Sequence, residues 1–332
     1  MGQYQKIMVV VNPAMRESTA LVRGVELANR SGAALHLLLA DYNPALFRAR
    51  FLDPATMQDA IRGYLEVRQQ WLDGEVQKLR TEGLEASGTA IWHKPVYEEI
   101  AHHALQQSPD LVIKDTDETS GLQGVFSHAD WHLMRLCPVP LMLVSSHSST
   151  APQKILAAID PYDLHGKPAE LNDVILEASL TMAYQSDAEV HVAHAFEFIP
   201  AAAPVGAESV FADQGLAEET RKEHEQVLRE FCDKHGIPAS QSRLVEGQPA
   251  TALPALAREM TADLLVLGTV GRSGLKRILM GATAEQVIGA AECDVLVVKP
   301  QGFIDDLKVE LAELRDDESL PEPWRDFRRK SL

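Results

Sequence analysis

Cysteine is scarce in this 332-residue chain, and long hydrophobic runs are missing. The three cysteines, Cys137, Cys232 and Cys293, are too few for a disulfide framework, so we expect a reducing compartment, the cytoplasm. The longest apolar run, at 33–40, contains a histidine and is too short to cross a membrane. The first residues are polar, and we expect no targeting signal there.

Positive charge is also in short supply. The chain has 31 Lys and Arg against 48 Asp and Glu, which gives a net charge of -17. A field of this sign repels phosphate backbones and anionic lipids, so we expect no nucleic-acid partner and no membrane partner. The remaining composition, with 45% hydrophobic residues, is that of a globular protein long enough for two domains.

Three segments of the first half recur about 150 residues later. Residues 6–13 (KIMVVVNP) resemble 154–161 (KILAAIDP), 110–116 (DLVIKDT) resemble 263–269 (DLLVLGT), and 140–144 (PLMLV) resemble 294–298 (DVLVV). A repeat of this length indicates duplicated domains. We therefore predict domains at 1–147 and 152–300, joined by a small polar linker. A charged tail at 301–332 follows, with one helix around 304–314.

Short apolar segments alternate with longer amphipathic segments in both halves. In the first half, strands are expected at 7–11, 34–39, 86–92, 111–114 and 141–144, and helices at 18–31, 57–81, 96–107 and 129–135. Strands that are apolar throughout are typical of parallel sheets with both faces covered. We therefore predict an α/β fold with two tandem, doubly wound, Rossmann-like parallel sheets.

A glycine-rich segment follows the strand expected at 264–267 in the second half. Residues 264–284 contain Gly268, Gly271, Gly274, Gly281, Arg272, Lys276 and Arg277, and no acidic residue. Glycines let backbone N–H groups approach an anion, and the helix expected at 283–289 adds its N-terminal dipole. Because ligands of open α/β sheets bind beyond the carboxyl ends of the strands, this segment is a candidate phosphate site. The alternative is a glycine-rich surface loop with solvated charges.

The spacing Gly268-x2-Gly271-x9-Gly281 resembles the nucleotide motif of the universal stress protein family, Gly-x2-Gly-x9-Gly-Ser/Thr. A first strand that leads to Asp160 and a last strand at 295–298 are similar too. The resemblance covers about residues 1–300 and is nearest to the tandem, UspE-like members of the family. It implies a sheet like that of the adenine nucleotide alpha hydrolases and a stress-response role. The implied ligand is ATP, or AMP or ADP, with magnesium accompanying ATP.

The resemblance also implies a set of site residues in the second half. Asp160, preceded by Ala158 and Ile159, would lie beside the adenosine, and Ala195 would meet the adenine through its backbone. The ribose and phosphates would lie among Leu267, Gly268, Val270, Gly271, Arg272, Gly281, Ala282 and Thr283. Ala282 replaces the family's hydroxyl residue, and the loss of one hydrogen bond costs about 1 kcal/mol, or about fivefold in affinity, unless Thr283 compensates.

The first half departs from this pattern. Asn12 stands where Asp160 does, Asp115 where Gly268 does, Glu118 where Gly271 does and His128 where Gly281 does. Side chains at these positions block close approach of the backbone, and the acidic ones repel phosphate. We therefore expect a degenerate domain that does not bind ATP. An apolar small molecule in its cleft is an alternative.

No nucleophile paired with a base is evident, so we predict a binding protein without catalytic residues. Two alternatives stay open: a slow ATPase or nucleotidyl transferase, and a carrier or scaffold that holds a lipid-like molecule in the first half. The last strands, 141–144 and 295–298, are expected to pair within the chain as an intramolecular pseudo-dimer, because pairing removes an exposed sheet edge. A homodimer is the alternative.

Several histidines have more ordinary interpretations. His128 and His132 are one helical turn apart, as zinc ligands are, but no third ligand is evident, so we predict no metal site. His93 and the pair at 102–103 are expected at the surface or at the rim of a pocket. Residues 221–225 (RKEHE) are expected on a solvated helix face.

Overall fold

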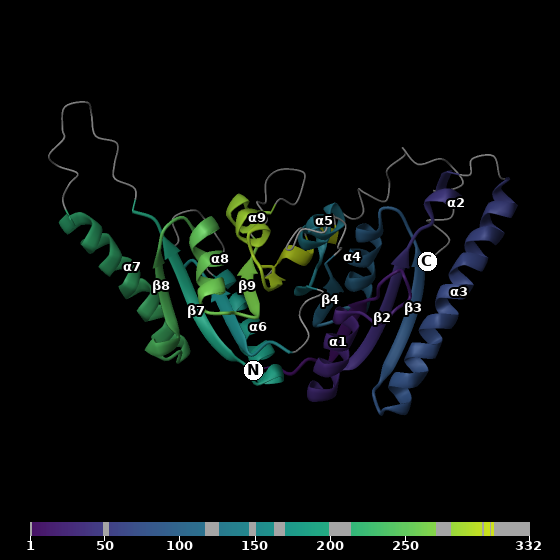
Figure 1. The fold of residues 1–332 in the computed structure, drawn as a ribbon, viewed down its shortest axis with the longest axis horizontal. Coiled ribbons are helices and arrows are strands. Elements are labelled where there is room, and N and C mark those ends of the chain that lie inside the picture. The colour runs from purple at the N-terminus through teal and green to yellow at the C-terminus, as the bar shows by residue number, and fades with distance from the viewer. Residues whose placement is uncertain are drawn as a thin grey trace. The chain divides into compact units, whose positions relative to one another are not determined.

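The computed structural model forms two compact units (Figure 1). It describes residues 2–48, 53–116, 126–145, 151–162, 170–198, 214–269, 280–300, 302–305 and 307–308. The first unit holds the described residues from 2 to 151 and those after 301, and the second unit holds those from 152 to 300.

Five parallel strands are described in the first unit. They are β1 (Lys6–Val10), β2 (Ala34–Asp41), β3 (Ala86–Trp92), β4 (Leu111–Asp115) and β5 (Leu141–Val144), in the order β3-β2-β1-β4-β5. The helices are α1 (Thr19–Ser31), α2 (Pro44–Arg48), α3 (Pro54–Thr81), α4 (Val96–Gln107) and α5 (His128–Leu136). Of the predicted elements, β3, α4 and β5 have the expected bounds. Helix α3 begins before residue 57 because Asp53 caps it, accepting hydrogen bonds from the backbone N–H groups of Ala55 and Thr56.

The second unit repeats this arrangement. Its strands are β6 (Lys154–Ala158), β7 (Glu189–Phe196), β8 (Ser242–Glu246), β9 (Leu264–Gly268) and β10 (Asp294–Val298), in the order β8-β7-β6-β9-β10. The helices are α6 (Glu170–Ser186), α7 (Gln214–His235), α8 (Pro249–Glu259) and α9 (Ala282–Gly289), with a short 3-10 helix at Ala239–Gln241. The predicted α/β fold with two doubly wound parallel sheets is confirmed. In each sheet the strand order reverses beside the first strand, at β1/β4 and at β6/β9, which is where such sheets bind ligands.

Equivalent polar contacts hold the two sheets at their amino ends. The Asp110 carboxylate accepts hydrogen bonds from the backbone N–H groups of Gln5 and Lys6, and Asp263 does the same for Gln153 and Lys154. Between these ends and the carboxyl edges, the central strands are fully buried and apolar. The duplication inferred from the sequence therefore extends to side-chain contacts outside the hydrophobic core.

The helix predicted around 304–314 lies mostly outside the described residues. Residues 303–305 and 307–308 are helical, and Phe303 and Leu307 are buried. The rest of the predicted tail cannot be compared with the prediction.

Two histidines form a buried pair between β2 and α4. The Nε2 atoms of His36 and His103 are 2.8 Å apart, and His36 Nδ1 is 2.8 Å from the Ser87 hydroxyl. Of the two expected places for His93 and His103, the surface or the rim of a pocket, the surface is wrong, since their exposed fractions are 9% and 8%. The apolar positions of α4 pack against the sheet, and His103 shares their face.

We expect this pair to make the first unit less stable as the pH falls. Burial, His103 and Lys6 lower the pKa of His36 to about 4, whereas an unfolded histidine titrates near pH 6.5. Between these values the unfolded chain binds the extra proton, so stability that is complete above pH 6.5 is lost toward pH 4. Urea midpoints at pH 7.5 and pH 5 measure this loss. His36→Leu should show a smaller loss than the wild type, and an equal loss would contradict the assignment.

Candidate functional site

Asn172 of α6 fixes the segment that follows β6. Its Oδ1 accepts a hydrogen bond from the Asp160 backbone N–H at 3.0 Å, and its Nδ2 donates one to the Asp160 carbonyl at 2.8 Å. Both backbone groups of Asp160 are therefore held by one side chain. Asn172 was not among the residues predicted from the sequence. Its position in the first turn of the helix that follows β6 could have indicated this role.

The register of β6 and β7 brings the predicted adenosine residues together. Ala158 pairs with Ala193, and the Ile159 N–H continues the ladder with a hydrogen bond to the Ala193 carbonyl at 2.9 Å. Continued two residues beyond the last pair, past the end of β6, this parallel register would align Asp160 with Ala195. Asp160 and Ala195 thus lie at the carboxyl ends of two neighbouring strands, β6 and β7.

Gly268, the last residue of β9, is required by packing. A Cβ atom built on it would lie 2.7 Å from the side chain of Leu171 in α6. Packing against Leu171 therefore accounts for the glycine without any ligand. The absence of a side chain also leaves the end of β9 open to close approach of a ligand. Leu267 beside it is buried, and it pairs with Ala158 of β6.

A lysine stands at the same sheet edge. Lys299, directly after β10, donates a hydrogen bond from Nζ to the Thr269 hydroxyl at 2.6 Å, and Thr269 is 2% exposed. Lys299 is a second residue that the sequence interpretation missed, because the repeat offers no hint of it: Ser145 follows β5 in the first half. Val270, Gly271 and Arg272 lie outside the described residues.

The N-terminus of α9 is not capped by any side chain among the described residues. Its N-cap is Gly281, at φ -66°, and a Cβ there would meet nothing within 4 Å. Ala282 and Thr283, the first two helical residues, are exposed. Helix N-termini carry unpaired N–H groups and a partial positive charge, so this end of α9 suits an anion.

The matching helix of the first unit is closed by a capping box. Ser127 Oγ accepts a hydrogen bond from the Asp130 N–H at 3.1 Å, and Asp130 Oδ2 accepts one from the Ser127 N–H at 2.9 Å. Asp130 is fully buried and forms an ion pair with Lys114 at 2.9 Å. Counted from the N-caps, Ser127 and not His128 is the counterpart of Gly281, which corrects the sequence alignment by one residue.

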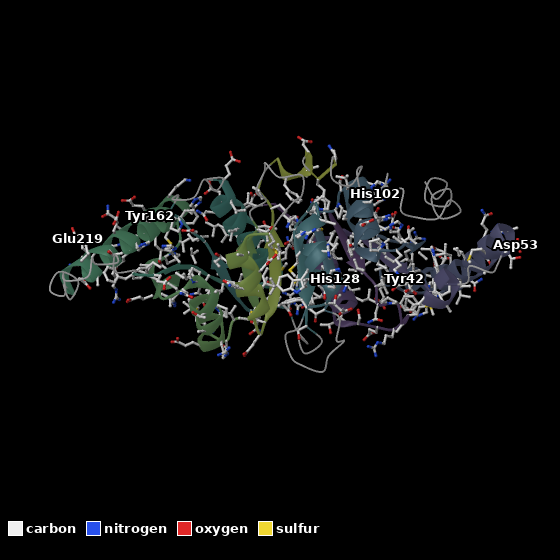
Figure 2. The ribbon with its side chains drawn as sticks, turned by 90° about the horizontal axis from the view of Figure 1, so that it is seen from above. Tyr42, Asp53, His102, His128, Tyr162 and Glu219 are labelled. Carbon is white, nitrogen blue, oxygen red and sulfur yellow. The ribbon has the colours of Figure 1, made fainter. Side chains whose placement is uncertain are left out.

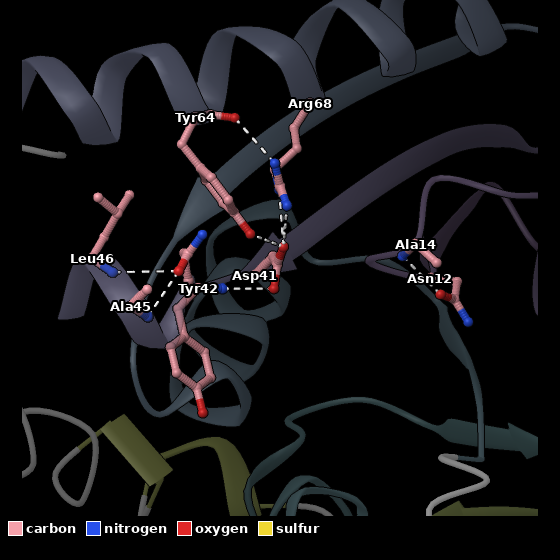
Figure 3. A network of polar contacts seen from close by, with 9 residues as sticks. Asn12, Ala14, Asp41, Tyr42, Ala45, Leu46, Tyr64 and Arg68 are labelled. Carbon is pink, nitrogen blue, oxygen red and sulfur yellow. Dashed lines mark hydrogen bonds and ion pairs between the residues drawn. The ribbon is translucent and has the colours of Figure 1, made fainter. Parts of the chain in front are cut away.

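Internal hydrogen bonds also occupy the strand ends of the first unit. Asp115 Oδ1 accepts a hydrogen bond from the Ala20 N–H at 2.8 Å, at the start of α1. Asn12 Oδ1 accepts one from the Ala14 N–H at 2.9 Å (Figure 3). Glu118, the other residue that departs from the motif, lies outside the described residues. The Asp115 side chain thus fills the position of Gly268, whereas Asn12 accepts the same turn hydrogen bond that Asp160 accepts from Tyr162.

A saturated carboxylate ends strand β2 (Figure 3). Asp41 accepts hydrogen bonds from the Tyr64 hydroxyl, from Arg68 Nε at 2.9 Å and from the Tyr42 N–H at 2.7 Å. Burial and the hydrogen bond to Asp41 raise the pKa of Tyr64 well above its usual range, so the phenol stays a donor. These contacts leave Asp41 little capacity to accept from a ligand hydroxyl.

The histidines of α5 pack against an aromatic ring. The His128 and His132 rings are 4.3 Å apart edge to face, and His132 stacks on Tyr97 at 4.4 Å. Burial lowers the pKa of His132, which favours the neutral ring in this stack. No group of three metal-ligating side chains was found among the described residues.

Residues 3–145 and 152–299 both match the sequence model of the universal stress protein family. The chain therefore belongs to the universal stress protein family and carries two of its domains in tandem. No helix in the described part of the chain is long and apolar enough to cross a membrane.

The chain is similar over nearly its whole length to two of the following three proteins. Universal stress protein E of Escherichia coli K12 is 29% identical over 96% of this chain and 100% of its own length. A structure of a protein of unknown function from Pseudomonas aeruginosa PAO1 is 26% identical, covers 93% of this chain and 98% of its own, and has a TM-score of 0.71. A shorter universal stress protein, solved in complex with cAMP, is 24% identical over 45% of this chain and 98% of its own, with a TM-score of 0.28.

Proposed function

We propose that the second unit binds an adenine nucleotide, ATP or its mono- or diphosphate, and that the first unit is a degenerate domain that does not. In this proposal the protein acts in the cytoplasmic stress response as a nucleotide-binding protein. The observation that carries the proposal is the difference between two matching helices. Helix α9 begins at Gly281 with no side-chain cap, whereas α5 begins with the Ser127 and Asp130 capping box.

Charge and shape at the second sheet edge favour the phosphates. The uncapped N–H groups of α9 carry partial positive charge, and Lys299 adds a full positive charge beside Thr269. The chain supplies no acidic residue between 264 and 284. This local sequence, which contrasts with the net charge of -17, supports a phosphate site at this edge, although Glu285 lies in the first turn of α9.

The adenosine part of the nucleotide is assigned to the ends of β6 and β7. The Asp160 carboxylate can accept hydrogen bonds from ribose hydroxyls, as acidic residues do in other doubly wound sheets. The backbone of Ala195 is next to it in register and offers donor and acceptor groups to the adenine edge. Asn172 holds Asp160 in this position through two backbone hydrogen bonds.

Asn172→Ala is therefore expected to weaken ATP binding by up to about thirtyfold, because Asp160 loses its two supports, each worth about 1 kcal/mol. The matched control is Asn43→Ala in the first unit, whose Oδ1 likewise accepts hydrogen bonds from the backbone N–H groups of Ala45 and Leu46. Calorimetric titration with ATP should show the loss for Asn172→Ala alone. Equal affinities for the two variants would refute the positioning role of Asn172.

A further inference from the structure

An aromatic stack lies beside the predicted adenosine residues of the second unit. The His224 ring of α7 packs between Phe196 of β7 and Tyr162, with centroid distances of 4.8 Å and 4.7 Å and interplanar angles of 24° and 33°. The expectation that residues 221–225 lie on a solvated face is wrong for His224. The other four residues of that run are exposed, but His224 turns toward the sheet.

The inner end of this stack is anchored in the core. His194 of β7 is 2% exposed, and its Nε2 lies 2.8 Å from His224 Nδ1. Phe196 is 4% exposed and covers one face of the His224 ring. Burial lowers the pKa of His224, against the opposing effect of Glu223 and Asp160, which favours the neutral ring. The stack is therefore a fixed, uncharged surface.

The outer end of the stack is Tyr162, which is tied at both ends. Its backbone N–H donates a hydrogen bond to Asp160 Oδ1 at 3.3 Å, and its hydroxyl donates one to Glu223 of α7. Tyr162, labelled in Figure 2, is half-buried. Tyr162 thus presents an aromatic surface two residues from the carboxylate that would bind the ribose.

The first unit has the same turn without the ring. There Ala14 donates its N–H to Asn12 Oδ1, as Tyr162 donates to Asp160 Oδ1. The turn therefore does not require an aromatic residue. The ring occurs only in the unit to which the nucleotide is assigned, which points to a role in ligand binding.

We propose that Tyr162, backed by His224 and Phe196, is a stacking platform for the purine base of the nucleotide. This inference rests on the proposed function and specifies its base subsite. Bases stack on aromatic side chains through their π-faces, and removal of such a ring from a nucleic-acid-binding protein commonly weakens binding by about tenfold or more. A purine covers more of the ring than a pyrimidine does, so the platform favours ATP over CTP.

The test uses the full chain with Tyr162→Ala and Tyr162→Phe, titrated with ATP, adenosine and tripolyphosphate. We expect Tyr162→Ala to weaken ATP and adenosine by the same factor, about tenfold, and to leave tripolyphosphate unchanged. Tyr162→Phe keeps the ring and should bind ATP within about twofold of the wild type, because it loses only the hydroxyl.

Three results would overturn the platform. They are unchanged ATP affinity in Tyr162→Ala, an equal loss for tripolyphosphate, and a loss in Tyr162→Phe as large as in Tyr162→Ala. Failure of the proposed function looks different, because the wild type would then bind neither ATP nor adenosine. In that case the platform is rejected together with the nucleotide site. A wild type that binds both, with an unaffected Tyr162→Ala, rejects the platform alone.

Discussion

Gly281→Asp is expected to reduce ATP affinity by about a hundredfold while leaving the second unit at least as stable as the wild type. A side chain fits at this position, because a Cβ meets nothing within 4 Å and φ is -66°. Aspartate is a preferred N-cap and stabilises a helix by a few tenths of a kcal/mol relative to glycine at that position. Its carboxylate would occupy the N–H groups of α9 and repel phosphate, so the lost charge-assisted hydrogen bonds account for the drop.

The control for this prediction is Gly281→Ala, which adds bulk without a cap or a charge. We expect its ATP affinity to stay within about threefold of the wild type, since no hydrogen-bonding group is lost. Calorimetry gives the affinities, and thermal unfolding gives the stabilities. Wild-type affinity in Gly281→Asp, or equal losses in both variants, would contradict an anion site at α9.

Lys114→Met is expected to destabilise the first unit by about 3–5 kcal/mol, because it leaves the fully buried Asp130 carboxylate without its cation. The capping box retains one hydrogen bond to that carboxylate, but a backbone N–H does not neutralise its charge. Urea denaturation followed by circular dichroism measures the loss. A change below about 1 kcal/mol would show that the ion pair contributes little.

The second unit suggests the matched control for that ion pair. Counted from the N-caps and strand ends, Leu267 and Ala284 occupy the places of Lys114 and Asp130, and both are buried. The double variant Lys114→Leu with Asp130→Ala copies this apolar pair. We expect it to recover most of the loss, since replacement of a buried ion pair by apolar residues is often nearly neutral. A double variant less stable than Lys114→Met would contradict this account.

The strands could be predicted from the sequence because their signal is local. Segment 141–144 (LMLV) is an apolar run between Pro140 and Ser145, and β5 has those bounds, whereas β3 at 86–92 (ASGTAIW) also has its predicted bounds although it carries small polar residues. The predicted start of α3, at residue 57, is three residues too late, because Asp53 caps the helix and Pro54 occupies its first turn. The ends of helices and strands thus depend on capping and turn residues that are visible in the sequence.

The candidate site was harder to predict because its supports come from distant elements. Asp160 and Ala195 follow from strand ends, because each lies at the carboxyl end of one of the paired strands β6 and β7. Asn172 and His224 act only through tertiary contacts. His224 sits in a charged run whose periodicity indicates solvent, and only the position of α7 against β7 turns it inward. A single sequence does not show which face of α7 packs against the sheet.

Gly268 shows a different limit. The motif assigns this glycine to the ligand, whereas its closest neighbour is the Leu171 side chain of α6. A residue that fits a binding motif can thus be required by packing alone. Gly281, which has open space around its Cβ position, carries the stronger argument for a ligand.

The most direct test of the account is the stoichiometry of ATP binding to the full chain, measured by calorimetric titration. We expect one ATP per chain, with the binding lost in Gly281→Asp and kept in Gly281→Ala. Two ATP molecules per chain would contradict the degenerate first unit. No binding at millimolar ATP, or one ATP that persists unchanged in Gly281→Asp, would contradict the nucleotide site of the second unit.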